Sequence, residues 1–349
     1  MLVTDYVTLG VSGLRVSPFA FGGGTLGTKA EDKALLQTYI DRGGNFVDTA
    51  EIYGFYGKSE EWLGQFLAAS GLRDRLVISS KFGPNIGFDV NCGGNGRKNL
   101  IRALNDSLLR LRSDYLDLYW LHVWDTVTPV DEVVETMNDQ VRAGKIRYYG
   151  LSNVPAWYAA RAYTLAHEHR LSRPIALQMQ YSLIERNIEY EHLPVARELG
   201  LGICAYSPLG DGFLSGKYRR TETSFEGAGR LDSYRQSNFA FGRQLSSKDW
   251  LILDELVIVA RELGRSAAQI ALSWLAHQPG ITMTLIGASQ TSQLEENLDA
   301  ASIEIPPEML QRLNAISVPY SSYPYNMFST HFRGLLERGM TIRPWNRQR

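Results

Sequence analysis

The chain has 349 residues, 44% of them hydrophobic, and a formal net charge of −1 at pH 7. This length allows one large α/β barrel or two smaller domains, with enough apolar side chains to fill a substantial core. Because acids and bases are interspersed, no field of one sign is present to bind nucleic acid or an anionic membrane, and neither is expected as a partner.

The cysteine content and the N-terminal segment indicate where such a protein works. Only Cys92 and Cys204 occur, far apart, which argues against a disulfide framework and against a thiolate metal site. The first residues lack a basic segment followed by an apolar stretch, and no apolar run approaches the ~20 residues of a membrane span. We therefore expect a soluble, unprocessed, cytoplasmic protein without a resident metal.

Short apolar runs rich in β-branched and aromatic residues alternate with longer segments of helical period through most of the chain. The expected strands are residues 19–23, 45–48, 76–80, 115–121, 146–151, 175–179, 201–206 and 281–286. Such alternation is typical of βα units with a parallel sheet. Eight strands close a barrel, so the predicted fold class is α/β, a (β/α)8 TIM barrel in a single domain, with the barrel over about 18–302 and a tail at 303–349.

The segments between the runs carry apolar residues at i, i+3, i+4 spacing, which indicates helices that lie on a sheet. Two such stripes consist of Val130, Val133, Val134, Met137 and Val141, and of Leu253, Leu256, Val257, Ala260 and Leu263.

Three segments go beyond a minimal barrel. Residues 7–17, with turn glycines at Gly10 and Gly13, predict a small hairpin that plugs the barrel bottom. The long connection over 209–249 and the tail beyond Pro306 are rich in Pro, Gly and Ser, and we expect them to form loops and short helices that frame a site.

A glycine-rich segment offers a competing interpretation. Residues 22–27, GGGTLG, match G-x-G-x-x-G after an apolar run, and Asp48 follows at about the 20-residue distance of a ribose-binding acid in a dinucleotide fold. However, six more βα units continue without a domain boundary, and an open sheet gives Lys81 and His122 no reason to meet. These features favour a closed barrel in which the glycines form a rim loop.

Asp48, Tyr53, Lys81 and His122 each lie where an apolar run stops, so a parallel barrel would bring them to one face. A carbonyl that accepts a hydride also needs a proton, and a tyrosine with an ordinary pKa near ~10 is a poor donor unless a cation lowers that pKa. Lys81 is the candidate cation. Asp48 would hold it, and His122 would orient the substrate oxygen. Singly, each residue is more often structural, but their joint occurrence favours catalysis.

These residues lie in motifs that resemble the aldo-keto reductase superfamily: GNFVDTAEIYG at 44–54, Lys81 after its strand, and DYLDLYWLH at 114–122. The resemblance runs from about residue 9 to residue 300. NGRKN at 95–99, YSLIER at 181–186 and SPL at 207–209 are similar to aryl-alcohol dehydrogenase-like enzymes and potassium-channel β-subunits. The resemblance implies a (β/α)8 barrel that binds NADPH without a Rossmann fold and uses Tyr53 as the general acid.

The resemblance also implies which residues hold the cofactor. Ser152, Asn153 and Gln178 would bind the nicotinamide carboxamide, and Tyr206 would stack on the nicotinamide ring, where close relatives often carry tryptophan. The remaining cofactor positions around the rim and the pyrophosphate are Thr25, Ser207, Pro208, Leu209 and Gly212.

A further motif, at residues 286–297, is similar to the adenosine-binding loop of the superfamily. Its matching positions are Gly287, Ser289, Gln293, Glu296 and Asn297. Other branches use a lysine and an arginine there to clamp the 2′-phosphate, and this chain has Gly287 and Gln293 instead, which leaves NADH open beside NADPH. Lys217 and Arg230 could supply the positive charge.

The substrate is expected to be a small carbonyl compound or alcohol, with the aromatics Phe55, Phe82 and Trp124 lining its pocket. Two alternatives remain open beside the reductase. The barrel could be a regulatory subunit that resembles the channel β-subunits and senses nicotinamide redox state, or an enzyme that oxidises an alcohol with Tyr53 as the base. The oligomeric state stays open too.

Overall fold

The computed structural model describes residues 1–87, 89–221, 224–236, 244–328, 334–336 and 338–340. The chain divides into two compact units, Met1–Ser317 and Val318–Arg349. Within the described residues, no helix combines the length and the apolar character needed to cross a bilayer.

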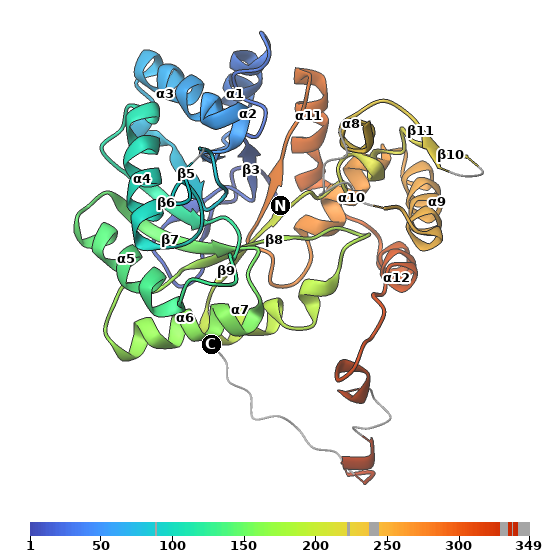
Figure 1. Cartoon of the computed structure of the whole chain (residues 1–349). Helices are drawn as coiled ribbons and strands as arrows, with labels where there is room; N and C mark the ends of the chain where they lie inside the picture. The colour runs from blue at the N-terminus through green and yellow to red at the C-terminus, as the bar shows by residue number, and fades with distance from the viewer. Residues whose placement is uncertain (88, 222–223, 237–243, 329–333, 337, 341–349) are drawn as a thin grey trace. The chain divides into compact units, whose positions relative to one another are not determined.

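Eight parallel strands of the first unit form a closed barrel, which confirms the predicted fold class (Figure 1). The ring closes where β12 pairs with β3, with Thr284 opposite Phe19. The observed strand ends lie within two residues of the expected ones. In ring order the strands are β12 (Met283–Ile286), β3 (Phe19–Gly22), β4 (Phe46–Asp48), β5 (Val77–Phe82), β6 (Leu116–Leu121), β7 (Ile146–Ser152), β8 (Ala176–Gln180) and β9 (Gly202–Tyr206).

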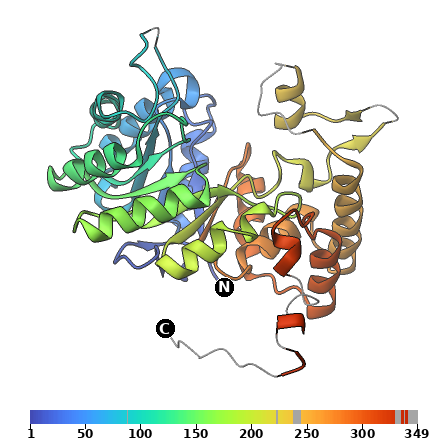
Figure 2. The same ribbon diagram turned by 60° about the horizontal axis from the view of Figure 1, so that its bottom comes forward.

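Helices surround the barrel (Figures 1 and 2). On α5 the predicted stripe is buried, with Val133, Val134 and Met137 against the core, and on α9 Leu253, Leu256 and Ala260 do the same. The longer helices are α1 (Asp32–Asp41), α3 (Lys58–Ser70), α4 (Arg97–Leu111), α5 (Val130–Arg142), α6 (Ala156–Glu168), α7 (His192–Leu199), α9 (Ser247–Glu262), α10 (Ala267–Ala276), α11 (Thr291–Asp299) and α12 (Pro307–Ile316).

Side chains alternate between the barrel interior and the layer beneath the helices, and this alternation aims the candidate site residues. Phe46 belongs to the inner cluster and Val47 to the outer one, so Asp48 points inward. On β5, Val77 is inner and Ile78 outer, which turns Lys81 inward by the same period of two.

An N-terminal hairpin lies at the strand starts, as predicted. β1 (Val7–Thr8) pairs antiparallel with β2 (Arg15–Val16). Leu9, just after β1, is fully buried in the inner cluster, and the Val11 N–H donates to Gly200 O at 2.8 Å. The hairpin therefore plugs the end of the barrel opposite to the strand ends that carry the candidate site.

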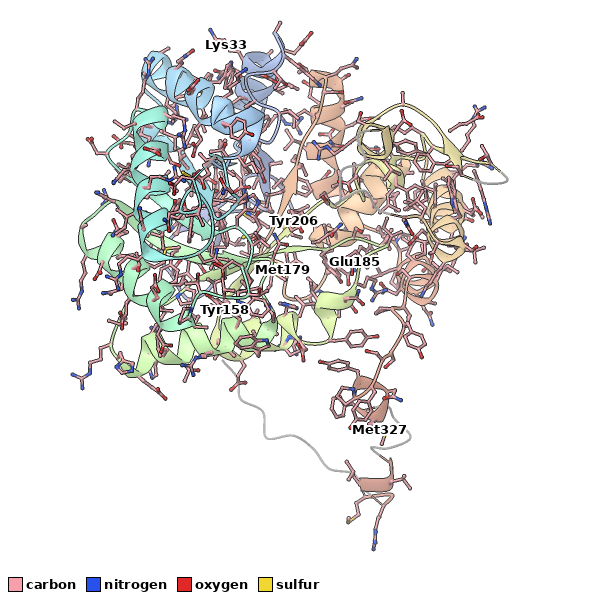
Figure 3. The ribbon with its side chains drawn as sticks, in the orientation of Figure 1. Lys33, Tyr158, Met179, Glu185, Tyr206 and Met327 are labelled. Carbon is pink, nitrogen blue, oxygen red and sulfur yellow. The ribbon has the colours of Figure 1, made fainter. Side chains whose placement is uncertain are left out.

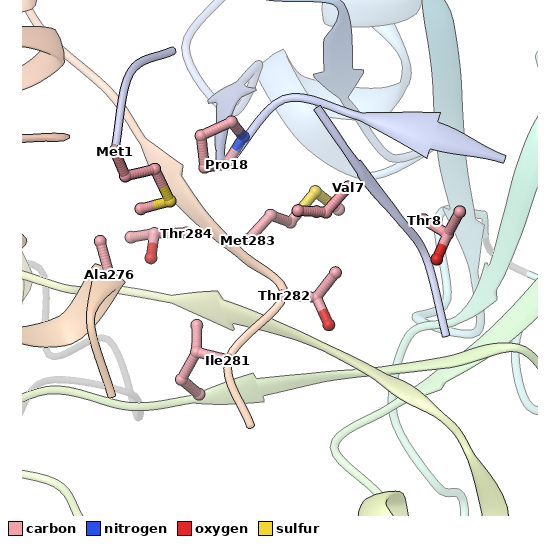
Figure 4. Close-up of a pocket in the computed structure, with 9 residues that line it drawn as sticks. All are labelled: Met1, Val7, Thr8, Pro18, Ala276, Ile281, Thr282, Met283 and Thr284. Atoms are coloured by element: carbon pink, nitrogen blue, oxygen red, sulfur yellow. The ribbon is translucent and has the colours of Figure 1, made fainter. Parts of the chain in front are cut away.

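A cavity beside this hairpin is visible in Figure 4. It is lined by Met1, Val7, Thr8, Pro18, Ala276, Ile281, Thr282, Met283 and Thr284. Since it contains none of the four candidate catalytic residues and lies at the strand starts, it is distinct from their site.

The long connection after β9 contains η3 (Phe213–Ser215), the antiparallel pair β10 (Arg219–Arg220) and β11 (Phe225–Glu226), and α8 (Arg230–Gln236). Other short elements are α2 (Tyr53–Tyr56), η1 (Arg73–Arg75), η2 (Asn187–Glu189) and η4 (Ala300–Ser302). The first part of the tail packs on the helix layer, because Arg312 of α12 pairs with Glu255 and Glu262 of α9.

The second unit, Val318–Arg349, contains η5 (Tyr325–Phe328). Tyr320, Tyr323 and Phe328 are exposed in it.

Gly10 should be essential to the hairpin. Its φ is +58°, and a Cβ there would meet Ile175 O and lie 2.6 Å from Gly200 O. We expect Gly10→Ala to lower the free energy of unfolding by about 2 kcal/mol or more, measured by urea denaturation. Gly13→Ala is the matched control, because a Cβ at Gly13 meets nothing within 4 Å. Equal stability of the two variants would contradict this account.

Candidate active site

The four residues singled out in the sequence converge at the barrel mouth. Asp48 ends β4, Lys81 lies near the end of β5, His122 follows β6, and Tyr53 begins α2. Lys81 forms an ion pair with Asp48, and its Nζ lies 3.4 Å from the Tyr53 hydroxyl. The rings of Tyr53 and His122 meet edge to face with centroids 5.8 Å apart.

The ion pair is fully buried and fully hydrogen-bonded. Lys81 Nζ also donates to Thr49 O at 2.9 Å, while Asp48 Oδ1 accepts from Ser79 Oγ at 2.6 Å and Gln178 Nε2 at 3.3 Å. Burial alone would lower the pKa of Lys81, but the charges of Asp48 and Tyr53 outweigh it and raise that pKa. Lys81 is thus a permanent cation beneath the Tyr53 hydroxyl.

His122 is held neutral. Burial, and then the charge of Lys81, lower the pKa of His122 from 6.5 to about 3. Its Nδ1 is buried and has no hydrogen-bond partner in the part of the chain that the structure describes. The mouth therefore offers a neutral imidazole beside a phenol.

The residues expected at the nicotinamide are bonded to this cluster. The Asn153 side chain donates to His122 O at 2.9 Å and to Ser152 Oγ at 3.0 Å, and it accepts from the Tyr206 hydroxyl at 2.7 Å. Tyr206, labelled in Figure 3, ends β9. The structure thus brings Ser152, Asn153, Gln178 and Tyr206 together around the tetrad.

The loop after β9 has an unusual backbone. Ser207, Gly210 and Gly212 have positive φ angles of 50°, 53° and 90°, and Pro208 and Leu209 lie between them. Lys217 lies beside this loop, since a Cβ on Gly212 would be 3.2 Å from its Nζ and one on Gly229, next to Arg230, would collide with it. Lys217 therefore places positive charge next to the predicted pyrophosphate loop.

The predicted adenosine loop is held by its own side chains. Gln293 Oε1 accepts from the N–H of Ser289 at 3.1 Å and from its hydroxyl at 2.8 Å, and Asn297 Nδ2 donates to Gly287 O at 3.3 Å. Glu296, on α11, is exposed. These residues form one compact turn at the start of α11.

The glycine-rich turn after β3 has a packing explanation. The Gly23 N–H donates to Asp48 O at 2.7 Å, and a Cβ at Gly23 would lie 2.8 Å from that oxygen. Thr25 is exposed in this loop. Because the barrel is closed and Asp48 binds Lys81, the alternative of an open dinucleotide fold is wrong.

The predicted substrate aromatics have different outcomes. Trp124, two residues after His122, is partly buried, and its ring lies edge to face with that of Trp157 at 5.4 Å. The prediction that Phe82 lines the pocket is wrong. The Phe82 side chain points to the opposite side of β5 from Lys81, so it is fully buried beneath the helices and stacks on Tyr119 with ring centroids 5.3 Å apart. The Phe55 side chain lies outside the described part of the structure.

The sequence analysis missed a buried acid next to the tetrad. Glu51, between Asp48 and Tyr53, is fully buried and pairs with Arg102 of α4 at 3.2 Å. The available signal was a charged residue three residues after a buried strand. Its partner is 51 residues away, so sequence spacing could not reveal it. The structure shows no cluster of acids, histidines and cysteines fit for a metal ion within its described residues.

Comparison with known proteins agrees with this geometry. The model of the aldo/keto reductase family matches residues 18–318, and the chain belongs to that family. "Uncharacterized oxidoreductase YrpG" of Bacillus subtilis (strain 168) is 35% identical over 89% of this chain and 95% of its own length. "Probable voltage-gated potassium channel subunit beta" of Oryza sativa subsp. japonica is 36% identical over 89% of this chain and 96% of its own length. "Norsolorinic acid reductase stcV" of Emericella nidulans (strain FGSC A4 / ATCC 38163 / CBS 112.46 / NRRL 194 / M139) is 32% identical over 87% and 79%.

The lowered pKa of His122 makes a prediction about acid stability. Below pH 6.5 the unfolded chain takes up a proton on His122 that the folded protein refuses until about pH 3, so stability is lost as the pH falls through this window. His122→Asn should lack this loss. We expect its stability relative to wild type to improve by on the order of 1 kcal/mol from about pH 7 to about pH 5.

The measurement is urea denaturation at the two pH values. His169→Asn, at an exposed position after α6, is the control and should follow wild type. A pH-independent difference between His122→Asn and wild type would show that His122 titrates normally.

Proposed function

We propose that this protein is an NADPH-dependent reductase that converts aldehydes or ketones to alcohols. The observation that carries the proposal is the position of a permanent cation, Lys81, 3.4 Å from the hydroxyl of Tyr53 at the mouth of the barrel. An ammonium group at this distance can stabilise the negative charge that develops on the Tyr53 oxygen while its proton is transferred. The reductases among the relatives support the same reaction class.

In this mechanism Tyr53 donates its proton to the carbonyl oxygen while negative charge develops there. Lys81 stabilises the resulting phenolate, and Asp48 keeps the ammonium charged and aimed. The neutral imidazole of His122 forms a hydrogen bond to the same oxygen and orients it. When bound, the nicotinamide supplies the hydride, and no further residue of the chain has to change its charge.

The residues around the mouth fit a dinucleotide. Asn153, Ser152 and Gln178 would bind the carboxamide, and Tyr206 would stack on the ring, while the turn of Ser289 and Gln293 would hold the adenosine. Gly287, Glu296 and Asn297 would complete this end. We propose NADPH over NADH, with Lys217 and the neighbouring Arg230 as the groups that would supply positive charge to the 2′-phosphate.

We further propose that the protein works in the cytoplasm on a small-molecule substrate. Its two cysteines are free, and Cys204 is buried in the barrel. Trp124 is the remaining aromatic that we propose as a wall of the substrate pocket.

Replacing the proposed acid should separate chemistry from binding. We expect Tyr53→Phe to lower the rate of carbonyl reduction by ~10²–10⁴-fold, because general acid catalysis is lost. Cofactor affinity, measured by quenching of intrinsic fluorescence, should stay the same, since the hydroxyl faces Lys81 rather than the cofactor loops. Turnover of simple aromatic aldehydes with NADPH is the readout. An unchanged rate in this variant would refute the role of Tyr53.

The same measurements of cofactor affinity and turnover, made on the wild-type protein, distinguish two other functions. Tight cofactor binding with negligible turnover and a stable protein partner would favour a regulatory subunit like the channel β-subunit relatives. Faster oxidation of alcohols than reduction of carbonyls would favour Tyr53 as a base in the reverse direction.

Lys217 should distinguish the two cofactors. We expect Lys217→Ala to weaken NADPH binding about five- to tenfold and to leave NADH binding little changed if the ammonium contacts the 2′-phosphate. Lys33→Ala is the control, because Lys33 is exposed on α1 and labelled in Figure 3 far from Tyr206. Equal losses for both cofactors would assign Lys217 to the shared pyrophosphate.

A further inference from the structure

Glu51 occupies a special place in the chain, because it lies between two residues of the tetrad, Asp48 and Tyr53. Its side chain is fully buried, yet among the described residues no hydrogen bond or ion pair joins it to the Lys81 ammonium or the Tyr53 hydroxyl. A buried carboxylate has a large desolvation cost, so its retention at this place calls for an explanation.

The contacts of Glu51 join the strand ends that carry the tetrad. Its backbone N–H donates to Lys81 O at 3.2 Å. Its Oε1 accepts from the N–H of Gly83 at 3.4 Å. The same peptide group, Phe82–Gly83, accepts through its carbonyl oxygen from the His122 N–H at 2.9 Å. One residue thus connects the loop of Tyr53 to the backbone of Lys81 and, through one peptide, to that of His122.

The second carboxylate oxygen is held from outside the barrel. Glu51 Oε2 accepts from Arg102 Nη2 at 3.2 Å. Arg102 is fixed on α4 by Asn99 Oδ1 at 2.7 Å and by Asp106 at 2.8 Å. The helix layer therefore determines where the Glu51 carboxylate lies, and through it where the turn before Tyr53 lies.

The charge balance at this carboxylate is delicate. Burial raises the pKa of Glu51 from 4.5 to about 7, and Arg102 opposes the rise. Glu60 of α3 raises the same pKa, and the buried Tyr119 of β6 is a further titratable neighbour. Arg102 is thus the partner that favours the ionised form of Glu51 against the effect of burial.

We propose that Glu51, held by Arg102, is a positioning residue that aligns Tyr53 with Lys81 and His122 for proton transfer. The inference rests on the proposed reductase function, since it assigns Glu51 a part in the same reaction. Proton transfer is sensitive to geometry, and a displacement of about 1 Å costs on the order of 10²-fold in rate. Glu51 acts through the backbone and touches no substrate.

The chain offers a matched control in Glu60. It is fully buried in the same layer, and it pairs with Arg110 at 2.7 Å and accepts a hydrogen bond from Ser80. Within the described residues, the Glu60 carboxylate bonds to the side chains of Ser80 and Arg110, whereas the Glu51 carboxylate also accepts from the backbone N–H of Gly83. Glu60→Gln therefore replaces a second buried carboxylate of the same layer and leaves the hydrogen bond from Gly83 to Glu51 in place.

The test compares kcat, KM and cofactor affinity of Glu51→Gln and Glu60→Gln with wild type, after thermal unfolding has shown that both variants are folded. We expect Glu51→Gln to lower kcat by about 10- to 100-fold with KM and cofactor affinity within about twofold, and Glu60→Gln to leave kcat within about twofold. Equal effects of the two substitutions on kcat would overturn the inference.

A double variant separates positioning from general damage. If Glu51 acts through Tyr53, Glu51→Gln should have no further effect on the residual rate of Tyr53→Phe. Multiplied losses in the double variant would show that Glu51 acts independently of Tyr53, against the proposal. Arg102→Met removes the other partner of the Glu51–Arg102 ion pair, on α4, and should lower kcat as Glu51→Gln does.

A crystal structure of Glu51→Gln gives a readout that does not need turnover. A distance between Tyr53 OH and Lys81 Nζ well beyond 3.4 Å supports the inference, and an unchanged distance overturns it. If wild type reduces no carbonyl compound, the proposed function fails, and this structure still decides whether Glu51 positions Tyr53.

Discussion

The buried ion pair of Lys81 and Asp48 is the interaction on which the mouth of this barrel depends. Two charges removed from water are stable only when their mutual attraction and further hydrogen bonds offset the desolvation cost. Thr49, Ser79 and Gln178 provide those bonds from three different segments. The pair therefore requires the strands β4, β5 and β8 to be in register, so the closed fold and the charged site stabilise each other.

The same pair decides which neighbour can act as an acid under the proposed function. The positive charge of Lys81 acts on two aromatic groups in opposite senses. After burial, it is the second cause that lowers the pKa of His122 to about 3, so the imidazole is neutral and offers a hydrogen bond from its remaining N–H rather than an acidic proton. At the Tyr53 hydroxyl, 3.4 Å away, the same ammonium group can stabilise negative charge that develops on the oxygen while the proton leaves. The phenol and the imidazole are thereby given different tasks by one ammonium group.

Much of this arrangement could be predicted from the sequence, because the strand periodicity and the strand-end polar residues are local signals. The eight strands, the hairpin and the meeting of Asp48, Lys81 and His122 follow from them. Phe82 could not be placed from proximity alone, since one step along β5 turns a side chain to the opposite face. The pair of Glu51 and Arg102 depends on how α4 packs against the barrel, which no local pattern records.

Side chains on two different sides of the barrel hold the residues at its mouth, so substitutions on the two sides should have different effects. On the side of β7 to β9, Asn153 and Gln178, which we assign to the nicotinamide, form hydrogen bonds to His122 and Asp48 of the tetrad. On the side of α4, Arg102 fixes Glu51 and the turn before Tyr53. Under the proposed function, cofactor binding and proton donation would thus be supported by different parts of the barrel. Substitutions in the outer helix layer could therefore alter proton transfer while the cofactor side remains intact.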